Sequence, residues 1–144
     1  MVREGSAPTR GLDLCWRDPI GLPKPMALRV IPGPQAQLFP PSVATRLLEA
    51  DWRVARESDR IGIRLEAGGT HPVLPPGIPP EGTTLGAIQA TPDGGLILLG
   101  PDRPVTGGYA KPFLLAAADL GRASALRPGD SVHLRRSLFA FIPH

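Results

Sequence analysis

Polar side chains able to bind or transform a ligand are concentrated in the turns of this sequence. Arginine, aspartate and glutamine can hold carboxylates or amides, and paired glycines expose backbone N–H groups that can hold an anion. Such groups often lie in loops on a rigid scaffold, because loop residues have no packing role. The candidates are Ser58-Asp59-Arg60, Gln89, Asp93, Asp102-Arg103, Thr106-Gly107-Gly108-Tyr109 and Lys111.

Each candidate also has an ordinary structural interpretation. An aspartate such as Asp59 often closes its own turn. Gln89 lies in an apolar run, so it is either a satisfied inward group or an outward one. Tyr109 and Lys111 are each available as an acid, a base or an anion contact, or are simply surface residues. The arginines of segment 53–64 favour a solvated strand face paired with acids.

Several signatures of catalysis and binding are missing from the chain. There is no G-x-x-x-x-G-K-[ST] phosphate loop and no G-x-S-x-G nucleophile elbow. The three histidines are widely separated, and with Cys15 they offer no metal-ligand spacing. The formal charge of +3 is not gathered into a basic stripe, and aromatic residues make up only 5%. We therefore expect no metal site, no nucleotide phosphate loop and no nucleic-acid partner.

Length and composition indicate one globular domain, or one domain with a tail. The chain has 144 residues, of which 42% are hydrophobic and 20% charged. Its 17 glycines and 19 prolines exclude a bundle of long helices. A single cysteine, and no apolar run near the ~18 residues of a membrane span, favour a soluble protein of the reducing cytoplasm.

The chain divides into a Pro/Gly-rich segment, residues 1–26, and a domain of short strands, residues 27–144. The first segment has the composition of a linker, or of a remnant of a missing N-terminal half, with one possible strand from Leu12 to Trp16. In the domain, a helix is expected from an N-cap at Ser42 to about Ala50, with Val43, Leu47 and Leu48 on one apolar face. Asp119 is expected to cap a second helix that runs to Leu126. Long loops are expected over 67–82 and 101–108, and a hairpin turn over 92–95. The expected strands are 28–31, 52–57, 61–66, 85–91, 96–99 and 132–134, with 138 as a further candidate.

The stretch 113–118 is ambiguous, because its alanines favour a helix while its short apolar run suits a buried strand. Seven or eight short strands with one or two short helices predict a mainly β fold, a closed or nearly closed barrel.

The ordered motifs together resemble the biotin-dependent carboxyltransferase-like family, also called allophanate hydrolase subunit 2, KipA or the C component of 5-oxoprolinase. The resemblance covers residues 28 to about 135. The motifs that carry it are Arg29-Val-Ile-Pro-Gly-Pro, Ser58-Asp-Arg-Ile-Gly-Ile-Arg-Leu, Glu81-Gly, Gly86-Ala-Ile-Gln, Pro92-Asp-Gly, Asp102-Arg, Thr106-Gly-Gly-Tyr, Ala118-Asp-Leu and Arg127-Pro-Gly-Asp.

This resemblance implies a cyclophilin-like β-barrel, in which 113–118 is a strand. It also implies partners, a KipI-like B component and a LamB/YcsF-like A component, in ATP-dependent opening of 5-oxoproline to L-glutamate. The chain itself would bind no cofactor, since ATP would enter through the partner proteins. The alternatives are a non-catalytic KipA-like regulator of a KipI-like protein and a truncated carboxyltransferase domain of urea carboxylase type.

Family members are about twice as long, so the chain resembles their C-terminal half. The resemblance implies either that a separate chain supplies the first half or that the gene is truncated. The sequence of this chain departs from the family pattern at Pro104-Val105, where a polar pair is usual, and in the Pro-rich stretch 72–80. Both departures fall beside the expected pocket.

The resemblance also implies one pocket for several of the candidates. We expect Gln89, Arg103 and Tyr109 as catalytic residues, with Arg103 and the Gly107-Gly108 backbone holding a carboxylate or a carboxyl-phosphate intermediate while Gln89 and Tyr109 orient the amide. The expected substrate-binding residues are Asp93, Thr106, Gly107, Gly108 and Lys111.

Overall fold

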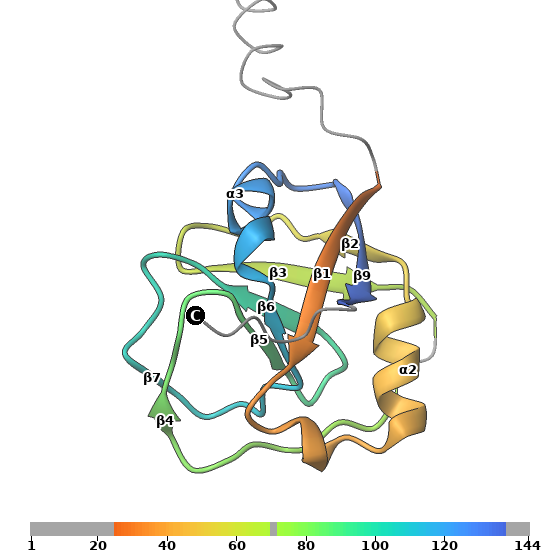
Figure 1. Cartoon of the computed structure of the whole chain (residues 1–144), viewed down its shortest axis with the longest axis vertical. Coiled ribbons are helices and arrows are strands. Elements are labelled where there is room, and N and C mark those ends of the chain that lie inside the picture. The colour runs from red at the N-terminus through yellow and green to blue at the C-terminus, as the bar shows by residue number, and fades with distance from the viewer. Residues whose placement is uncertain (1–24, 70–71, 138–144) are drawn as a thin grey trace, which may run out of the picture.

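Short segments of alternating apolar residues close into a barrel of seven strands, ordered β1-β8-β5-β6-β3-β2-β9 (Figure 1). The structure is a computed structural model that describes residues 25–69 and 72–137. All neighbouring strands are antiparallel except β1 and β9, which run parallel. The barrel strands are β1 Met26–Pro32, β2 Trp52–Val54, β3 Gly62–Ala67, β5 Ala87–Ala90, β6 Leu96–Leu99, β8 Phe113–Leu115 and β9 Ser131–Arg136. The expected mainly β barrel is confirmed.

The barrel interior is filled by side chains that alternate along each strand. Met26, Leu28 and Val30 of β1 and Val132 and Leu134 of β9 are all buried. Because successive strand residues point to opposite faces, the residues between them face outward. The interior is therefore a packed core, and any ligand site in this part of the molecule lies outside it.

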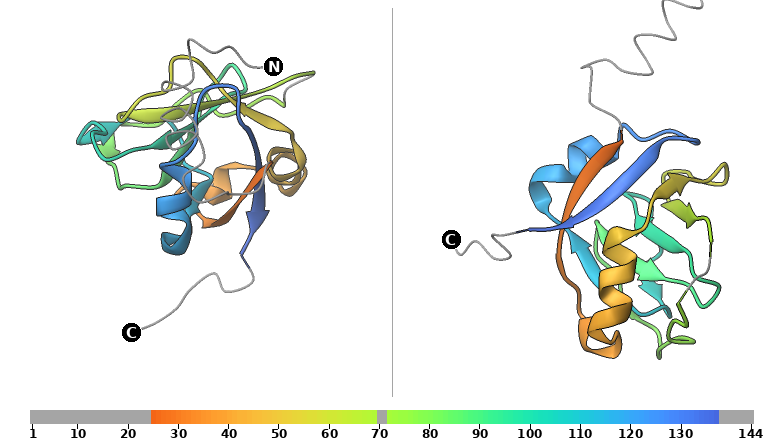
Figure 2. Two further views of the ribbon diagram at one scale, coloured as in Figure 1. Left: turned by 90° about the horizontal axis from the view of Figure 1, so that it is seen from above. Right: turned by 90° about the vertical axis from the view of Figure 1, so that its right-hand side faces the viewer.

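Helix α2 (Pro41–Glu49) lies against β9 on the outside of the barrel (Figure 2). Its expected apolar face is confirmed, because Leu47 is buried. The predicted N-cap at Ser42 is wrong: the N-cap is Pro40, and Pro41 begins the helix. Proline suits that first position, since its fixed φ is helical and its missing N–H would have no partner there.

The hairpin joining β5 to β6 forms as predicted. Gly94 adopts a φ of 97°, which only glycine adopts without strain. Asp93 Oδ1 accepts hydrogen bonds from the Thr91 hydroxyl and from the Gly95 N–H. The Asp93 side chain therefore closes the turn.

The ambiguous stretch 113–118 divides into a strand and a turn. Phe113–Leu115 is strand β8, whereas Ala117–Asp119 is a 3-10 helix, so the strand prediction is wrong for its last residues. The Ala116 N–H still donates to Arg29 O at 2.8 Å, and the Asp119 N–H then turns back to Ala116 O at 2.9 Å. Helix α3 is Leu120–Ala123, shorter than the predicted helix to Leu126.

Two segments expected to be loops each contribute a short strand. β4 (Glu81–Gly82) and β7 (Thr106–Gly107) pair antiparallel and form a two-stranded ribbon separate from the barrel (Figure 1). A 3-10 helix, Ala36–Leu38, follows β1. The possible strand from Leu12 to Trp16 and the strand candidate Leu138 lie outside the described residues. Within 25–69 and 72–137, no helix has the length and apolar character needed to cross a membrane.

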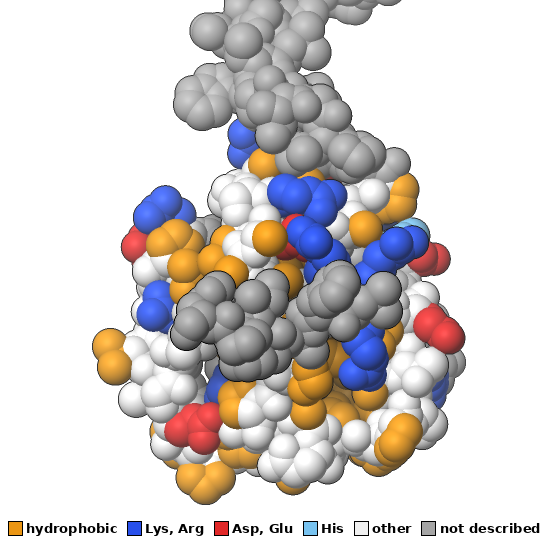
Figure 3. Space-filling model, viewed as in Figure 1, with side chains coloured by type: hydrophobic (Ala, Val, Ile, Leu, Met, Phe, Trp, Pro, Cys, Tyr) orange, Lys and Arg blue, Asp and Glu red, His pale blue; other side chains and the backbone are white. Residues whose placement is uncertain are grey.

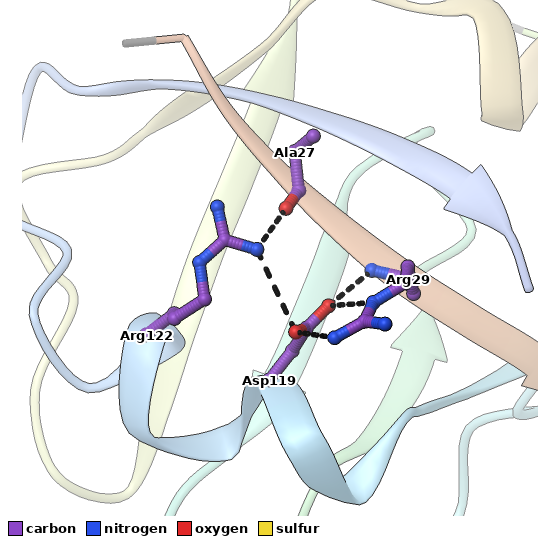
Figure 4. Close-up of polar contacts among 4 residues, drawn as sticks. All are labelled: Ala27, Arg29, Asp119 and Arg122. Carbon is purple, nitrogen blue, oxygen red and sulfur yellow. Dashed lines mark hydrogen bonds and ion pairs between the residues drawn. The ribbon is translucent and has the colours of Figure 1, made fainter. Parts of the chain in front are cut away.

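The Asp119 carboxylate completes one edge of the barrel (Figure 4). β8 pairs only with residues 30–32 of β1, which leaves the first half of that edge without a strand neighbour. There, Asp119 Oδ2 accepts from the Arg29 backbone N–H at 2.7 Å, and Arg122 Nη1 donates to Ala27 O at 2.9 Å. These side chains thus satisfy backbone groups that a longer β8 would have paired.

Asp119 also binds the Arg29 guanidinium, through Nε at 3.1 Å and Nη2 at 2.6 Å, and Arg122 Nη1 lies 3.5 Å from its Oδ1. It stands at the N-cap position of α3, as predicted, but its side chain makes no cap hydrogen bond. The hydrogen bonds from Arg29 outweigh burial and hold the pKa of the Asp119 carboxyl below its ordinary value.

We expect Asp119→Asn to lower the free energy of unfolding by about 2 kcal/mol, because charge-assisted hydrogen bonds to a buried acceptor are lost. Urea unfolding of the full chain measures this. The matched control is Asp102→Asn, which breaks only the exposed Arg60–Asp102 pair and should cost less than about 0.5 kcal/mol. Equal losses in the two variants would contradict the role of Asp119.

The difference in free energy of unfolding between the wild type and Asp119→Asn should depend on pH, because folding lowers the pKa of Asp119. A carboxyl whose pKa is lowered by folding stabilises the protein above its unfolded pKa, roughly 3.9, and loses that contribution as the pH falls through its folded pKa. The stability difference between the wild type and Asp119→Asn should therefore shrink in that acidic window.

Candidate functional site

A row of three side chains crosses the outer face of strands β3, β6 and β5. Arg64 pairs with Ile97, and Ile97 pairs with Gln89. Residues directly opposite on neighbouring antiparallel strands point to the same face. Since Leu65 and Leu96 are buried in the core, Arg64, Ile97 and Gln89 face away from it.

This row lies in an open hollow with a volume of about 610 Å³. Apolar side chains of β6 contribute to its lining, while the turn between β2 and β3 supplies acidic groups and Pro104 comes from the loop before β7. The complete lining is Glu57, Asp59, Ile61, Gly62, Arg64, Glu66, Gln89, Ile97, Leu99 and Pro104.

Gln89 is the buried polar group of the hollow. The residue is 6% exposed, and among the described residues its side-chain amide makes no hydrogen bond. Unlike Arg103 Nε, its amide atoms are not fully buried, so the amide opens onto the solvent of the hollow. A ligand entering the hollow could restore those hydrogen bonds.

Gly107 of β7 lies directly against this amide. A Cβ at Gly107 would come within 2.6 Å of Gln89 Nε2 and 3.3 Å of Thr83 Cγ2. Glycine at this position thus leaves room for the Gln89 amide beside the β4–β7 ribbon, and a larger residue would have to displace it. The structure brings together two of the predicted site residues, Gln89 and Gly107.

A cluster of Gln35, Glu81 and the buried Lys111 anchors the ribbon to the barrel. Lys111 is 2% exposed, and its Nζ lies 2.9 Å from Glu81 Oε2. Gln35 Nε2 donates to the same oxygen at 2.8 Å, and Gln35 Oε1 accepts from the Lys111 N–H at 3.0 Å. The hydrogen bonds from Lys111 and Gln35 lower the pKa of Glu81. The structure places Lys111 in this cluster and outside the lining of the hollow.

The remaining predicted residues are not part of the lining of the hollow. Asp93 lines a neighbouring hollow of about 290 Å³, which shares Glu66 with the first. Arg103 is half-buried, and its Nε has no hydrogen-bond partner within the described part of the chain. Tyr109 is 38% exposed. Gly108 O accepts from the Ile78 N–H at 2.8 Å.

Thr106 is exposed on β7. The predicted turn role of Asp59 is confirmed, because its Oδ1 accepts from the N–H groups of Ile61 and Gly62. The arginines of segment 53–64 are exposed, and Arg60 pairs with Asp102 at 3.0 Å.

Sequence reasoning missed Arg64 and Ile97 as site residues. Alternation along 61–66 places Arg64 and Glu66 on one face, but it gives no sign of which strand lies beside them. That information lies in the β3–β6 register, which pairs residues more than thirty positions apart. Among the residues that the structure describes, no group of three His, Cys, Asp or Glu side chains could hold a metal ion.

Comparison with known proteins places this chain in a family. The family described as the carboxyltransferase domain, subdomain A and B, matches residues 6–136. The chain belongs to this carboxyltransferase family. The match begins within the segment 1–26 that the sequence sets apart from the barrel.

This carboxyltransferase-family chain is similar to two curated proteins, each named as the C subunit of 5-oxoprolinase. The protein from Haemophilus influenzae is 29% identical over 123 residues, which cover 83% of this chain and 40% of the relative. The protein from Escherichia coli is 24% identical over 106 residues, which cover 74% of this chain and 34% of the relative. The chain thus spans well under half the length of these relatives.

Two solved structures share the fold of the carboxyltransferase-family chain. TTHA0988 is 35% identical with a TM-score of 0.66, over 79% of this chain and 22% of that protein. The K. lactis urea amidolyase is 25% identical with a TM-score of 0.65, over 76% of this chain and 7% of that protein. The resemblance inferred from the sequence motifs is therefore confirmed.

Gly107→Ala should move the Gln89 amide with little loss of stability. The added Cβ meets the end of a flexible side chain, which can shift. We expect the Gln89 side-chain amide resonances to move, while the free energy of unfolding changes by less than about 1 kcal/mol. In the matched control Gly82→Ala, on the partner strand, a Cβ meets nothing within 4 Å and the resonances should stay in place. Unmoved Gln89 resonances in Gly107→Ala would refute the close approach.

Glu81→Gln should loosen the β4–β7 ribbon, because it leaves the buried Lys111 ammonium without a carboxylate. Amide hydrogen exchange at Glu81 and Gly107 should accelerate, while exchange in the barrel strands is retained. Glu49→Gln, on the exposed surface of α2, is the control and should change amide exchange neither in the ribbon nor in the barrel strands. In the wild type, acidification through the lowered pKa of Glu81 should produce the same selective acceleration. Uniform acceleration over the whole barrel would argue against a local anchor.

Proposed function

We propose that this chain acts as the C component of an ATP-dependent 5-oxoprolinase, which opens 5-oxoproline to L-glutamate. The observation that carries the proposal is its similarity to the C component of 5-oxoprolinase from two bacteria. The hollow supports it, because an unpartnered primary amide complements a lactam. Gln89 can donate to the lactam oxygen and accept from the lactam N–H.

The other roles in this proposal follow the family resemblance. Arg103 and the Gly107-Gly108 backbone would hold the carboxyl-phosphate group formed during ATP-dependent ring opening, and Tyr109 would orient the amide together with Gln89. Arg103 is suited to this role, since its buried Nε has no partner among the described residues and guanidinium groups bind phosphate in a bidentate manner. Asp93, Thr106 and Lys111 would support the site from its edges.

The proposal includes partner proteins and a cellular compartment. A KipI-like B component and a LamB/YcsF-like A component would bring ATP and further catalytic groups. The complex would work in the cytoplasm. The chain alone would be inactive.

A carboxyltransferase is the second candidate function. The observation that favours it is the similarity to the Kluyveromyces lactis urea carboxylase, which is 25% identical over 76% of this chain with a TM-score of 0.63. This function requires a biotin carboxyl carrier as co-substrate, whereas the first requires 5-oxoproline. The two are therefore distinguished by which molecule the activity depends on.

The test is reconstitution of the complex from this chain and its candidate partner proteins. Glutamate release from 5-oxoproline and ATP should require the chain, and Gln89→Leu should lower it about tenfold or more, because a hydrogen bond to the reacting amide is lost. Gln37→Leu, at an exposed position, is the matched control and should retain full turnover. Both variants should remain folded, because neither glutamine side chain makes a hydrogen bond within the described part of the chain.

Turnover that is independent of the chain would refute its proposed role in the complex. Carboxyl transfer from a biotinylated carrier, in the absence of any 5-oxoproline turnover, would favour the second candidate instead.

A further inference from the structure

The hollow contains a second group positioned for a ligand, the Arg64 guanidinium. Arg64 is exposed, and its guanidinium makes no hydrogen bond or ion pair within the described part of the chain. It extends from the middle of β3 across from Ile97, which separates it from Gln89. The site thus presents a free cation and an unpartnered amide on opposite sides of one apolar side chain.

The spacing of this row fits a small molecule. Neighbouring strands lie about 4.8 Å apart, so the Arg64 and Gln89 backbones are roughly 10 Å apart across β6. Both side chains line the same hollow, with Ile97 between them. A five-membered ring with a carboxylate at one end and a lactam at the other has this size and this order of polar and apolar parts.

We propose that Arg64 is the carboxylate-binding residue of the site, and that the hollow selects small monoanionic amides whose apolar part rests on Ile97. This inference rests on the proposed function and names the group that would hold the substrate carboxylate. Arginine matches the planar, two-oxygen geometry of a carboxylate, whereas the Gln89 amide matches the lactam. Arg103 would then bind the phosphorylated carbonyl group and not the substrate carboxylate.

The acidic groups of the hollow set the charge that it accepts. Glu57 and Glu66 line it together with Arg64, and Asp59 lies beside them with one oxygen used by its own turn. These carboxylates outnumber Arg64 in the lining, so they disfavour each negative charge that Arg64 does not pair, because like charges at short range repel. A dicarboxylate should therefore bind much more weakly than a monocarboxylate of the same size.

The experiment is titration of the full chain with 5-oxoproline, its uncharged methyl ester and the dicarboxylate glutarate, followed by calorimetry and by the Gln89 side-chain amide resonances. We expect the wild type to bind 5-oxoproline at least about tenfold more tightly than the ester, since a charge-assisted hydrogen bond is lost. Arg64→Gln should bind both alike, at the ester's affinity. Added salt should weaken wild-type binding of 5-oxoproline but not the binding by Arg64→Gln, because exposed charges are screened.

Arg135→Gln is the matched control, because it removes one positive charge from an exposed position on β9, outside the lining of the hollow. It should retain wild-type affinity for 5-oxoproline. Arg103→Gln tests the alternative carboxylate partner and should weaken binding of 5-oxoproline less than Arg64→Gln does. Far-ultraviolet circular dichroism verifies that each variant is folded.

Three outcomes would overturn the inference: no detectable binding of 5-oxoproline, equal binding of acid and ester by the wild type, or loss of affinity in Arg103→Gln in place of Arg64→Gln. Failure of the proposed function is a separate result. If the chain binds 5-oxoproline through Arg64 while turnover by the complex does not depend on the chain, the binding site stands and the role in the complex fails. If turnover requires the chain but is unchanged in Arg64→Gln, the role in the complex stands and this inference fails.

Discussion

The Asp119 carboxylate is the contact on which closure of the barrel depends. β1 is the first described strand, and it has to pair with β9 on one side and with β8 on the other. β8 is too short to cover it, so Asp119 and Arg122 satisfy the backbone at Arg29 and Ala27. A side chain in this role ties the turn after β8 to the first strand.

Closure of the barrel determines where a ligand can bind. The interior is occupied by core side chains, so binding groups can only lie on the outer face, where β3, β6 and β5 carry Arg64, Ile97 and Gln89. The β4–β7 ribbon covers one side of this face and is anchored by the buried Lys111. On the face drawn in Figure 3, basic, acidic and apolar side chains are interspersed, so this face carries no large patch of a single charge.

Much of the barrel could be predicted from local pattern, and much of the site could not. Strand alternation and the Pro92-Asp93-Gly94-Gly95 turn depend on neighbours in sequence, so the β5–β6 hairpin was predicted correctly. The end of the strand at Leu115 depends on Arg29, 86 positions earlier, and this is why the stretch 113–118 was ambiguous. Helix α2 was found by its apolar face, whereas its first residue was misplaced because Ser42 is a common cap and Pro41 an equally good first residue.

The same distinction separates Gln89 from Arg64. Gln89 stood out because a polar residue inside an apolar run is locally anomalous. Arg64 belongs to a series of arginines on an exposed strand, and only the pairing of β3 with β6 makes it different from Arg60, which the Asp102 carboxylate already neutralises. A buried amide and an exposed guanidinium, both lacking partners among the described residues, face one hollow from two strands. Since the fold leaves the hydrogen-bonding capacity of both groups unused, this pair defines the chemistry that a ligand has to supply.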